Sequence, residues 1–145
     1  MTWKEFALEF VWDGAWRDIY VVGANLEDWQ CLLDELIASM PHDIDFYIQG
    51  NKVSSAPSAK VIFERRHETS TLLQVTLGKV HLNCHFFCEE EIEFDLDPRE
   101  MKSDEDLQAV KAFMRTLANV TNKPAILTHE NDQEAVILTV QPESG

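Results

Sequence analysis

The chain has 145 residues, of which 45% are hydrophobic and 26% are charged, as is typical of a single globular domain. Acidic residues outnumber basic ones by 26 to 12, and the net charge of −14 disfavours binding to nucleic acid or anionic membranes. No apolar run approaches the ~20 residues that span a bilayer, and residues 1–5 lack the pattern of a secretory signal. Three cysteines, an odd number, argue against a disulfide framework. We expect one cytoplasmic domain over residues 1–145 with reduced thiols.

The N-terminal segment has an alternating pattern. Apolar side chains occupy every second position of residues 5–12, which predicts a half-buried strand. A hairpin loop over residues 13–16 would connect it to a second strand over residues 17–22. This arrangement would place Trp12 beside Arg17, within reach of a cation–π contact.

The next segment predicts a helix, a strand and a short helix. Apolar residues recur at helical spacing over residues 26–40, with Asn25 as the expected N-cap and Pro41 as the terminator. Alternation over residues 44–48 predicts a third strand. After a loop rich in serine and alanine, residues 61–67 are expected to form a short helix.

The central segment predicts a hairpin with a well-defined register. Two alternating stretches, residues 73–77 and 80–88, flank Gly78-Lys79, a pair suited to a two-residue type II′ turn. Such a turn sets Leu77 opposite Val80, so both strands turn their apolar residues to one core face. The next strand, residues 92–96, shares that face if Cys88 lies opposite Ile92.

This register also predicts which polar side chains meet on the opposite face of the sheet. It sets His85 opposite Asp95 and Asn83 opposite Asp97. A slip of one residue would drive Glu93 and Asp95 into the core, which is energetically very costly.

The C-terminal segment predicts a second main helix and a closing hairpin. Ser103 is the expected N-cap of a helix that ends at Lys123-Pro124, and residues 125–128 and 135–140 are expected to pair. The predicted fold is an α+β two-layer sandwich: a curved antiparallel sheet with two main helices on one face. The predicted element order is ββαβ, a short helix, then βββαββ.

The strongest candidate site is the solvent-facing side of this sheet, where acidic residues concentrate. Our first hypothesis is a non-enzymatic interaction module that binds a basic protein through electrostatic attraction. It assigns no catalytic residue, cofactor or metal, and its candidate partner-binding residues are Glu91, Glu93, Asp95, Asp97, His81, His85, Phe87 and Trp16.

The sequence is also compatible with alternative functions. His81 and His85 beside Asp95 could bind a divalent metal or perform acid–base catalysis. The spacing of His81, Cys84, His85 and Cys88 suggests zinc, but on a strand the cysteines and histidines point to opposite faces and cannot converge. A small ligand could also bind between the sheet and the helices.

In length, acidity and ββα arrangement, the chain resembles the small bacterial immunity proteins, which neutralise basic toxins. The resemblance implies an acidic surface that binds one basic protein partner.

Overall fold

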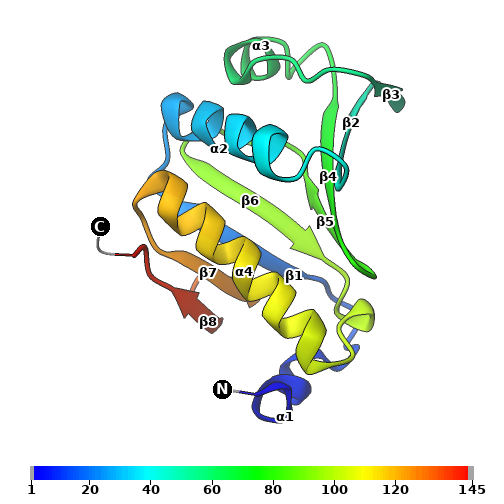
Figure 1. Ribbon diagram of the computed structural model, residues 1–145, viewed down its shortest axis with the longest axis vertical. Coiled ribbons are helices and arrows are strands. Elements are labelled where there is room, and N and C mark those ends of the chain that lie inside the picture. Colours follow the sequence, from blue (N-terminus) through cyan, green and yellow to red (C-terminus); the bar gives the residue numbers. More distant parts are fainter. Residues whose placement is uncertain (1, 144–145) are drawn as a thin grey trace.

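An eight-stranded antiparallel sheet forms the scaffold of residues 2–143, the part of the chain that the computed structural model describes (Figure 1). The strands lie side by side in the order β3-β2-β4-β5-β6-β1-β7-β8. Their bounds are β1 (Arg17–Val22), β2 (Ile44–Ile48), β3 (Asn51–Val53), β4 (Thr71–Leu77), β5 (Val80–Cys84), β6 (Glu91–Leu96), β7 (Ala125–His129) and β8 (Val136–Val140).

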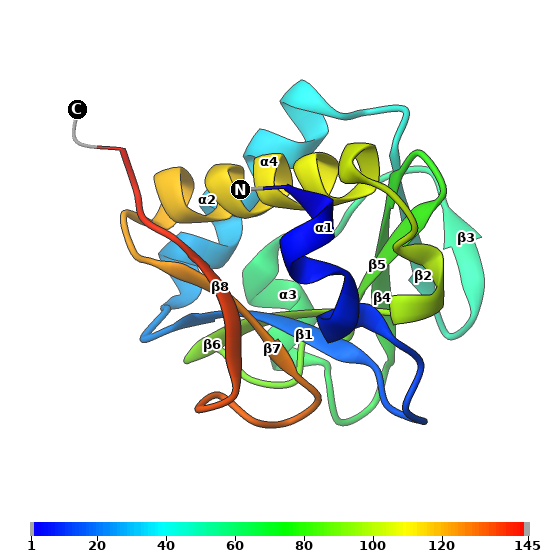
Figure 2. The same cartoon turned by 90° about the horizontal axis from the view of Figure 1, so that it is seen from below.

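Two main helices, α2 (Leu26–Ser39) and α4 (Asp104–Thr121), lie over one face of this sheet (Figure 1, Figure 2). Asn25 caps α2 and Ser103 caps α4, each through a side-chain oxygen that accepts a backbone N–H. Such a cap contributes about 1 kcal/mol. The fold class predicted from the sequence is therefore confirmed. Within residues 2–143, no helix is long and apolar enough to cross a membrane.

The core lies between the sheet and these two helices. Ile92, Phe94 and Leu96 of β6 are fully buried, and the Phe94 ring packs edge-on against Phe113 of α4 with centroids 5.0 Å apart. Because side chains alternate along a strand, the acidic residues between them project from the opposite side. We call that side, the one facing away from α2 and α4, the outer face.

The N-terminal segment differs from its prediction. Residues 5–12 do not form a strand, because they belong mainly to a short helix α1 (Trp3–Phe6) and a 3₁₀ helix η1 (Ala7–Phe10). Phe6 and Phe10 are buried while Leu8 is 85% exposed. A spacing of four residues suits one face of a helix as well as alternate positions of a strand, so the apolar pattern was ambiguous.

The contacts expected from the N-terminal hairpin change accordingly. The cation over the Trp12 ring is Arg99, whose Cζ lies 3.9 Å from the ring centroid, and not Arg17. Arg17 is instead buried, with 1% exposure. With residues 5–12 helical, β1 is free to pair with β6 on one side and β7 on the other.

The central hairpin has the predicted register, but the next pairing is shifted by two residues. Leu77 lies opposite Val80 as expected. Asn83, however, lies opposite Asp95 and not opposite Asp97. The expected strand over residues 80–88 is shorter, since β5 ends at Cys84 and Phe86 adopts a left-handed conformation with φ of 55°. A shift of two keeps the side chains of β5 on their predicted faces, which explains why the pattern could not detect it. Cys88, which was expected opposite Ile92, instead forms a bridge with Glu91.

Two further boundaries differ slightly from the predictions. Helix α3 (Ala59–Glu64) begins two residues before the expected position, because Ser58 provides an N-cap at 3.2 Å from the Val61 nitrogen. The three-residue strand β3 falls partly in an expected loop, where Lys52 forms an ion pair with Asp45 at 2.9 Å. A short 3₁₀ helix, η2 (Pro98–Glu100), follows β6.

Candidate functional site

Carboxylates from two adjacent strands meet at the centre of the outer face. In the β1–β6 register Asp18 lies opposite Asp95, and Tyr20 lies opposite Glu93. We call Asp18, Glu93 and Asp95 the carboxylate cluster. Glu93 and Asp95 were predicted to lie on this face, whereas Asp18 was missed because β1 was expected to pair with residues 5–12.

The carboxylate cluster is held by neutral hydrogen-bond donors. Asp18 is 3% exposed and accepts hydrogen bonds from the Asn131 backbone N–H at 2.7 Å and the Tyr20 hydroxyl at 3.1 Å. Asp95 accepts one from the Asn83 amide at 3.2 Å. These donors satisfy the buried oxygens but do not neutralise their charge.

Burial raises the pKa of every member of the carboxylate cluster, and repulsion from neighbouring carboxylates adds to the effect. Burial, together with the charge of Asp18 and of neighbouring acidic groups, raises the pKa of Glu93 to about 7. Burial is also the main cause of the raised pKa values of Asp18 and Asp95. In the described chain the lysine and arginine ion pairs all involve other carboxylates. The cluster is therefore a place where added positive charge would be favourable.

His85 adjoins the carboxylate cluster, although Asn83 and not His85 lies opposite Asp95, and Phe87 stacks on His85. The His85 Nε2 atom lies 3.7 Å from the Asp95 Oδ2 atom, and the His85 ring stacks on Phe87 with centroids 5.3 Å apart. Phe87 is 63% exposed. Glu91, also on β6, is half-buried and accepts a hydrogen bond from Gln133 at 2.8 Å.

The other three predicted site residues lie toward the opposite end of β6. Asp97 binds Arg99 through both carboxylate oxygens, at 2.8–3.2 Å, and this lowers its pKa. His81 is engaged by Glu100, with 3.0 Å between Nδ1 and Oε2. Trp16 is half-buried and donates its backbone N–H to Glu130 at 3.2 Å. The structure therefore groups five of the eight predicted residues and separates three.

The histidine and cysteine residues of the central segment do not converge on one point. Among residues 2–143, no three histidine, cysteine, aspartate or glutamate side chains form a group that could hold a metal ion. Cys84 is fully buried in the core, which raises the pKa of its thiol. Cys88 is half-buried, and its thiol pKa is raised for the same reason.

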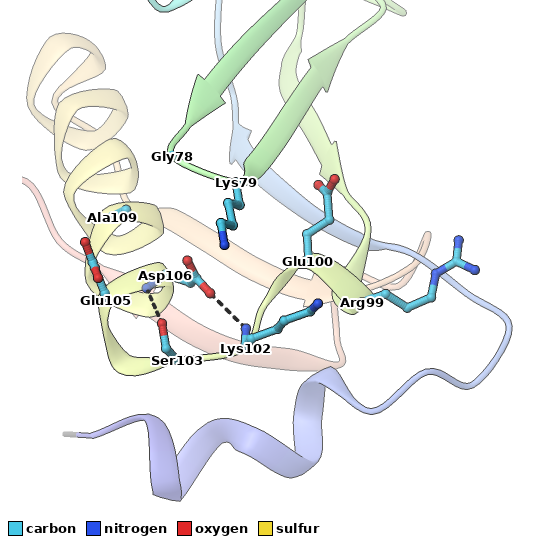
Figure 3. Close-up of a pocket in the computed structure, with 9 residues that line it drawn as sticks. All are labelled: Gly78, Lys79, Arg99, Glu100, Lys102, Ser103, Glu105, Asp106 and Ala109. Atoms are coloured by element: carbon cyan, nitrogen blue, oxygen red, sulfur yellow. Dashed lines mark hydrogen bonds between the residues drawn. The ribbon is translucent and has the colours of Figure 1, made fainter.

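A pocket of about 680 Å³ opens between the β4–β5 turn and the start of α4 (Figure 3). Lys79 extends from the turn toward α4, whereas the Arg99 side chain points away (Figure 3). The Asp106 carboxylate already accepts the Lys102 backbone N–H at 2.9 Å. The lining mixes acidic and basic side chains, so its charge favours no particular class of ligand.

Comparisons with known proteins identify a fold but no family. No protein-family model matches the chain, and no curated protein matches it in sequence. Among solved structures, it is similar to a chain from the crystal structure of the toxic C-terminal tip of CdiA from Pseudomonas aeruginosa in complex with immune protein. The identity is 12%, the TM-score is 0.51, and the match covers 86% of this chain and 94% of that chain. At this identity the similarity establishes a shared fold.

Proposed function

We propose that this chain is a non-enzymatic module that binds a basic protein through the outer face of β6 and β1, in the manner of an immunity protein. The carboxylate cluster carries the proposal. Its members have raised pKa values and no lysine or arginine ion-pair partner within residues 2–143. A cationic side chain supplied by a partner would relieve their repulsion and favour their charged forms.

The fold comparison supports this proposal in a general way. The matched chain comes from a complex between a toxin fragment and an immune protein. That description belongs to those proteins, and it makes a basic, toxin-like protein the first class of partner to test. The net charge of −14 would also speed the approach of such a partner through long-range attraction.

A second candidate, acid–base catalysis, is favoured by one observation. The pKa of Glu93, about 7, suits a group that exchanges protons near neutral pH. Asp95 lies on the same face, and His85 lies 3.7 Å from Asp95. The two candidates differ in one requirement, because a catalyst must turn over a substrate whereas a binder needs a stoichiometric complex.

The proposal can be tested by affinity capture from the source cell. The wild-type chain is immobilised beside two double variants, Glu93→Gln with Asp95→Asn, and Glu27→Gln with Glu105→Gln. Glu27 and Glu105 are exposed on the helices, so the second variant also replaces two carboxylates by amides, but at a distance from the outer face. We expect a basic protein to be retained by the wild type and the helix variant, and lost from the outer-face variant.

Salt provides a further control, since attraction between exposed charges weakens as ionic strength rises. Retention should be stronger at low salt than at moderate salt. Recovery of no specific partner at either salt, or equal retention by both double variants, would contradict the proposal.

A further inference from the structure

The turn that follows β5 presents one aromatic ring to solvent and buries its neighbour. Phe86 is 2% exposed and packs against Trp29 and Phe63, with ring centroids 5.2 Å and 6.0 Å away. Its φ of 55° is uncommon for a bulky residue. Phe87, the next residue, projects outward with 63% exposure. A large apolar ring that is exposed directly after an uncommon backbone conformation calls for a functional explanation.

Phe87 is held in place in the free protein. Its ring stacks on His85 at 5.3 Å with an interplanar angle of 29°. Its backbone carbonyl accepts a hydrogen bond from the guanidinium of Arg66, which follows α3. An apolar group that is already ordered loses little conformational entropy on binding, so it suits an interface anchor.

The surroundings of Phe87 combine apolar surface with charged groups of both signs. A cavity of about 440 Å³ lies beside the ring and is lined by the apolar Ile62 and Phe86, by the basic Arg66 and His67, and by other residues. His85 connects Phe87 to Asp95 of the carboxylate cluster through its 3.7 Å contact. Glu89 and Glu90 follow directly in the sequence and are exposed.

Among residues 2–143, the other exposed aromatic ring lies elsewhere. Trp12 is 43% exposed, but it lies against Arg99, whose charge is shared with Asp97. Leu8 is 85% exposed in η1, and Val22 is 51% exposed opposite Glu91 of β6, but both side chains are aliphatic. Because Asp95, which has no lysine or arginine ion pair, contacts His85 and His85 stacks on Phe87, charge complementarity selects Phe87 among the exposed aromatic residues.

We infer that Phe87 is the apolar anchor of the partner interface, and that the partner is a basic protein whose contact surface has an apolar pocket edged by lysine or arginine. This inference rests on the proposed function. The Phe87 ring would enter the partner's pocket while the carboxylate cluster and Glu89-Glu90 meet its basic rim. Interfaces commonly concentrate their affinity in one such buried aromatic residue surrounded by polar contacts.

The test is direct titration calorimetry with the protein eluted from the wild-type column, expressed and purified as the probe. Phe87→Ala should weaken its affinity about thirtyfold or more, the loss that marks a hot spot. Phe87→Leu, which keeps an apolar side chain, should recover part of the loss. Leu8→Ala removes an exposed apolar side chain from η1 and is the matched control. The affinity of this variant is expected to stay within about threefold of the wild type.

The outcomes separate this inference from the proposed function. Thermal melting of Phe87→Ala should match the wild type, because the ring is exposed, so lost affinity would not reflect unfolding. Unchanged affinity for Phe87→Ala, or a larger loss for Leu8→Ala, overturns the anchor but leaves the carboxylate cluster as the binding site. Recovery of no partner, or unchanged affinity for the Glu93→Gln and Asp95→Asn double variant, overturns the proposed function and the anchor with it.

Discussion

Asp95 and Asp97 lie two residues apart at the end of the same strand, yet their pKa values shift in opposite directions. The guanidinium of Arg99 lowers the pKa of Asp97, and burial raises the pKa of Asp95. Asp95 has Asn83 and His85 as neighbours but no lysine or arginine ion pair within residues 2–143. Both residues lie in the same acidic chain, so the number of acidic residues does not explain the difference. The position of a few lysine and arginine side chains determines which carboxylates form ion pairs within the protein and which remain available to a partner.

The same contrast extends over the two ends of the outer face. At the Asp97 end, acidic residues are already engaged by the protein's own side chains, as in Asp97 with Arg99 at 2.8 Å and Glu100 with His81 at 3.0 Å. At the Glu93 end, the carboxylates repel one another. The first arrangement stabilises the fold, whereas the second reduces stability until positive charge arrives. Each prediction below changes one side of this contrast.

The largest expected effect is at Arg17, a buried cation that lies opposite Leu96 on the core side of the sheet, close to Asp97. Its guanidinium donates to the backbone carbonyls of Glu9 and Val11 and to the Asp13 carboxylate, and its side chain is 1% exposed. Arg17→Met would leave several partly buried oxygens without donors, so we expect a loss of roughly 2–3 kcal/mol in the free energy of unfolding. Urea denaturation at pH 7 measures this loss.

Arg99→Met is the matched control for that measurement. Arg99 also binds an aspartate, but its side chain is 55% exposed. Removing an exposed ion pair should cost less than about 1 kcal/mol. Equal losses for the two variants would contradict the expectation that Arg17 contributes more to stability because its side chain is buried.

The second effect is a pH dependence that originates in the carboxylate cluster. Glu93 titrates near 7 in the folded chain against an ordinary value of 4.5, so between these values the folded state binds more protons than the unfolded state. Stability must then fall as pH rises through that window, by roughly 1 kcal/mol after allowance for solvent screening. Asp18 and Asp95, whose pKa values are also raised, act in the same direction.

Glu93→Gln should remove much of this slope. We expect the variant to be more stable than the wild type at pH 8 and close to it at pH 5, as measured by urea denaturation at both values. Glu105→Gln, on the exposed side of α4, should leave the slope unchanged. A wild type whose stability rises from pH 5 to pH 8 would show that repulsion within the cluster is unimportant.

Local patterns were sufficient to predict much of the fold. The Gly78-Lys79 turn fixes its neighbours in register because only two residues separate the strands, and Leu77 lies opposite Val80 as predicted. The main helices were recognised from their caps, Asn25 and Ser103, and from apolar spacing. These features depend on residues close together in the chain, so periodicity and turn chemistry determine them.

The candidate site was less predictable, because it depends on contacts between distant segments. Asp18 joins Asp95 only because β1 lies between β6 and β7, and no local pattern specifies that strand order. The position of Phe10 could not distinguish a helix from a strand over residues 5–12, since it fits a helical face as well as a strand face. The left-handed conformation of Phe86 could likewise not be predicted from periodicity, although β5 ends two residues before it, at Cys84.

The smallest expected effect is at Asp97, and it tests the contrast most directly. Asp97→Asn keeps an oxygen that can accept the Arg99 backbone N–H, now at 2.9 Å, but removes the charge that pairs with the guanidinium. Since the Arg99 side chain of that pair is 55% exposed, we expect a loss of about 0.5–1 kcal/mol at pH 7, measured by urea denaturation. Because pairing lowers the pKa of Asp97, the difference should shrink as pH falls below the ordinary value of 3.8.

The same variant should leave partner affinity within about threefold of the wild type, whereas Asp95→Asn should reduce it at least tenfold, because only Asp95 offers an unneutralised charge. Asp95 and Asp97 are two residues apart and carry the same charge, so the general field of the protein changes almost equally in both variants. A partner whose affinity differs between the two variants must therefore respond to whether each carboxylate already has an ion-pair partner within the protein. A partner equally sensitive to both would be responding to net charge alone, and the distinction between the two ends of the outer face would then have no role in binding.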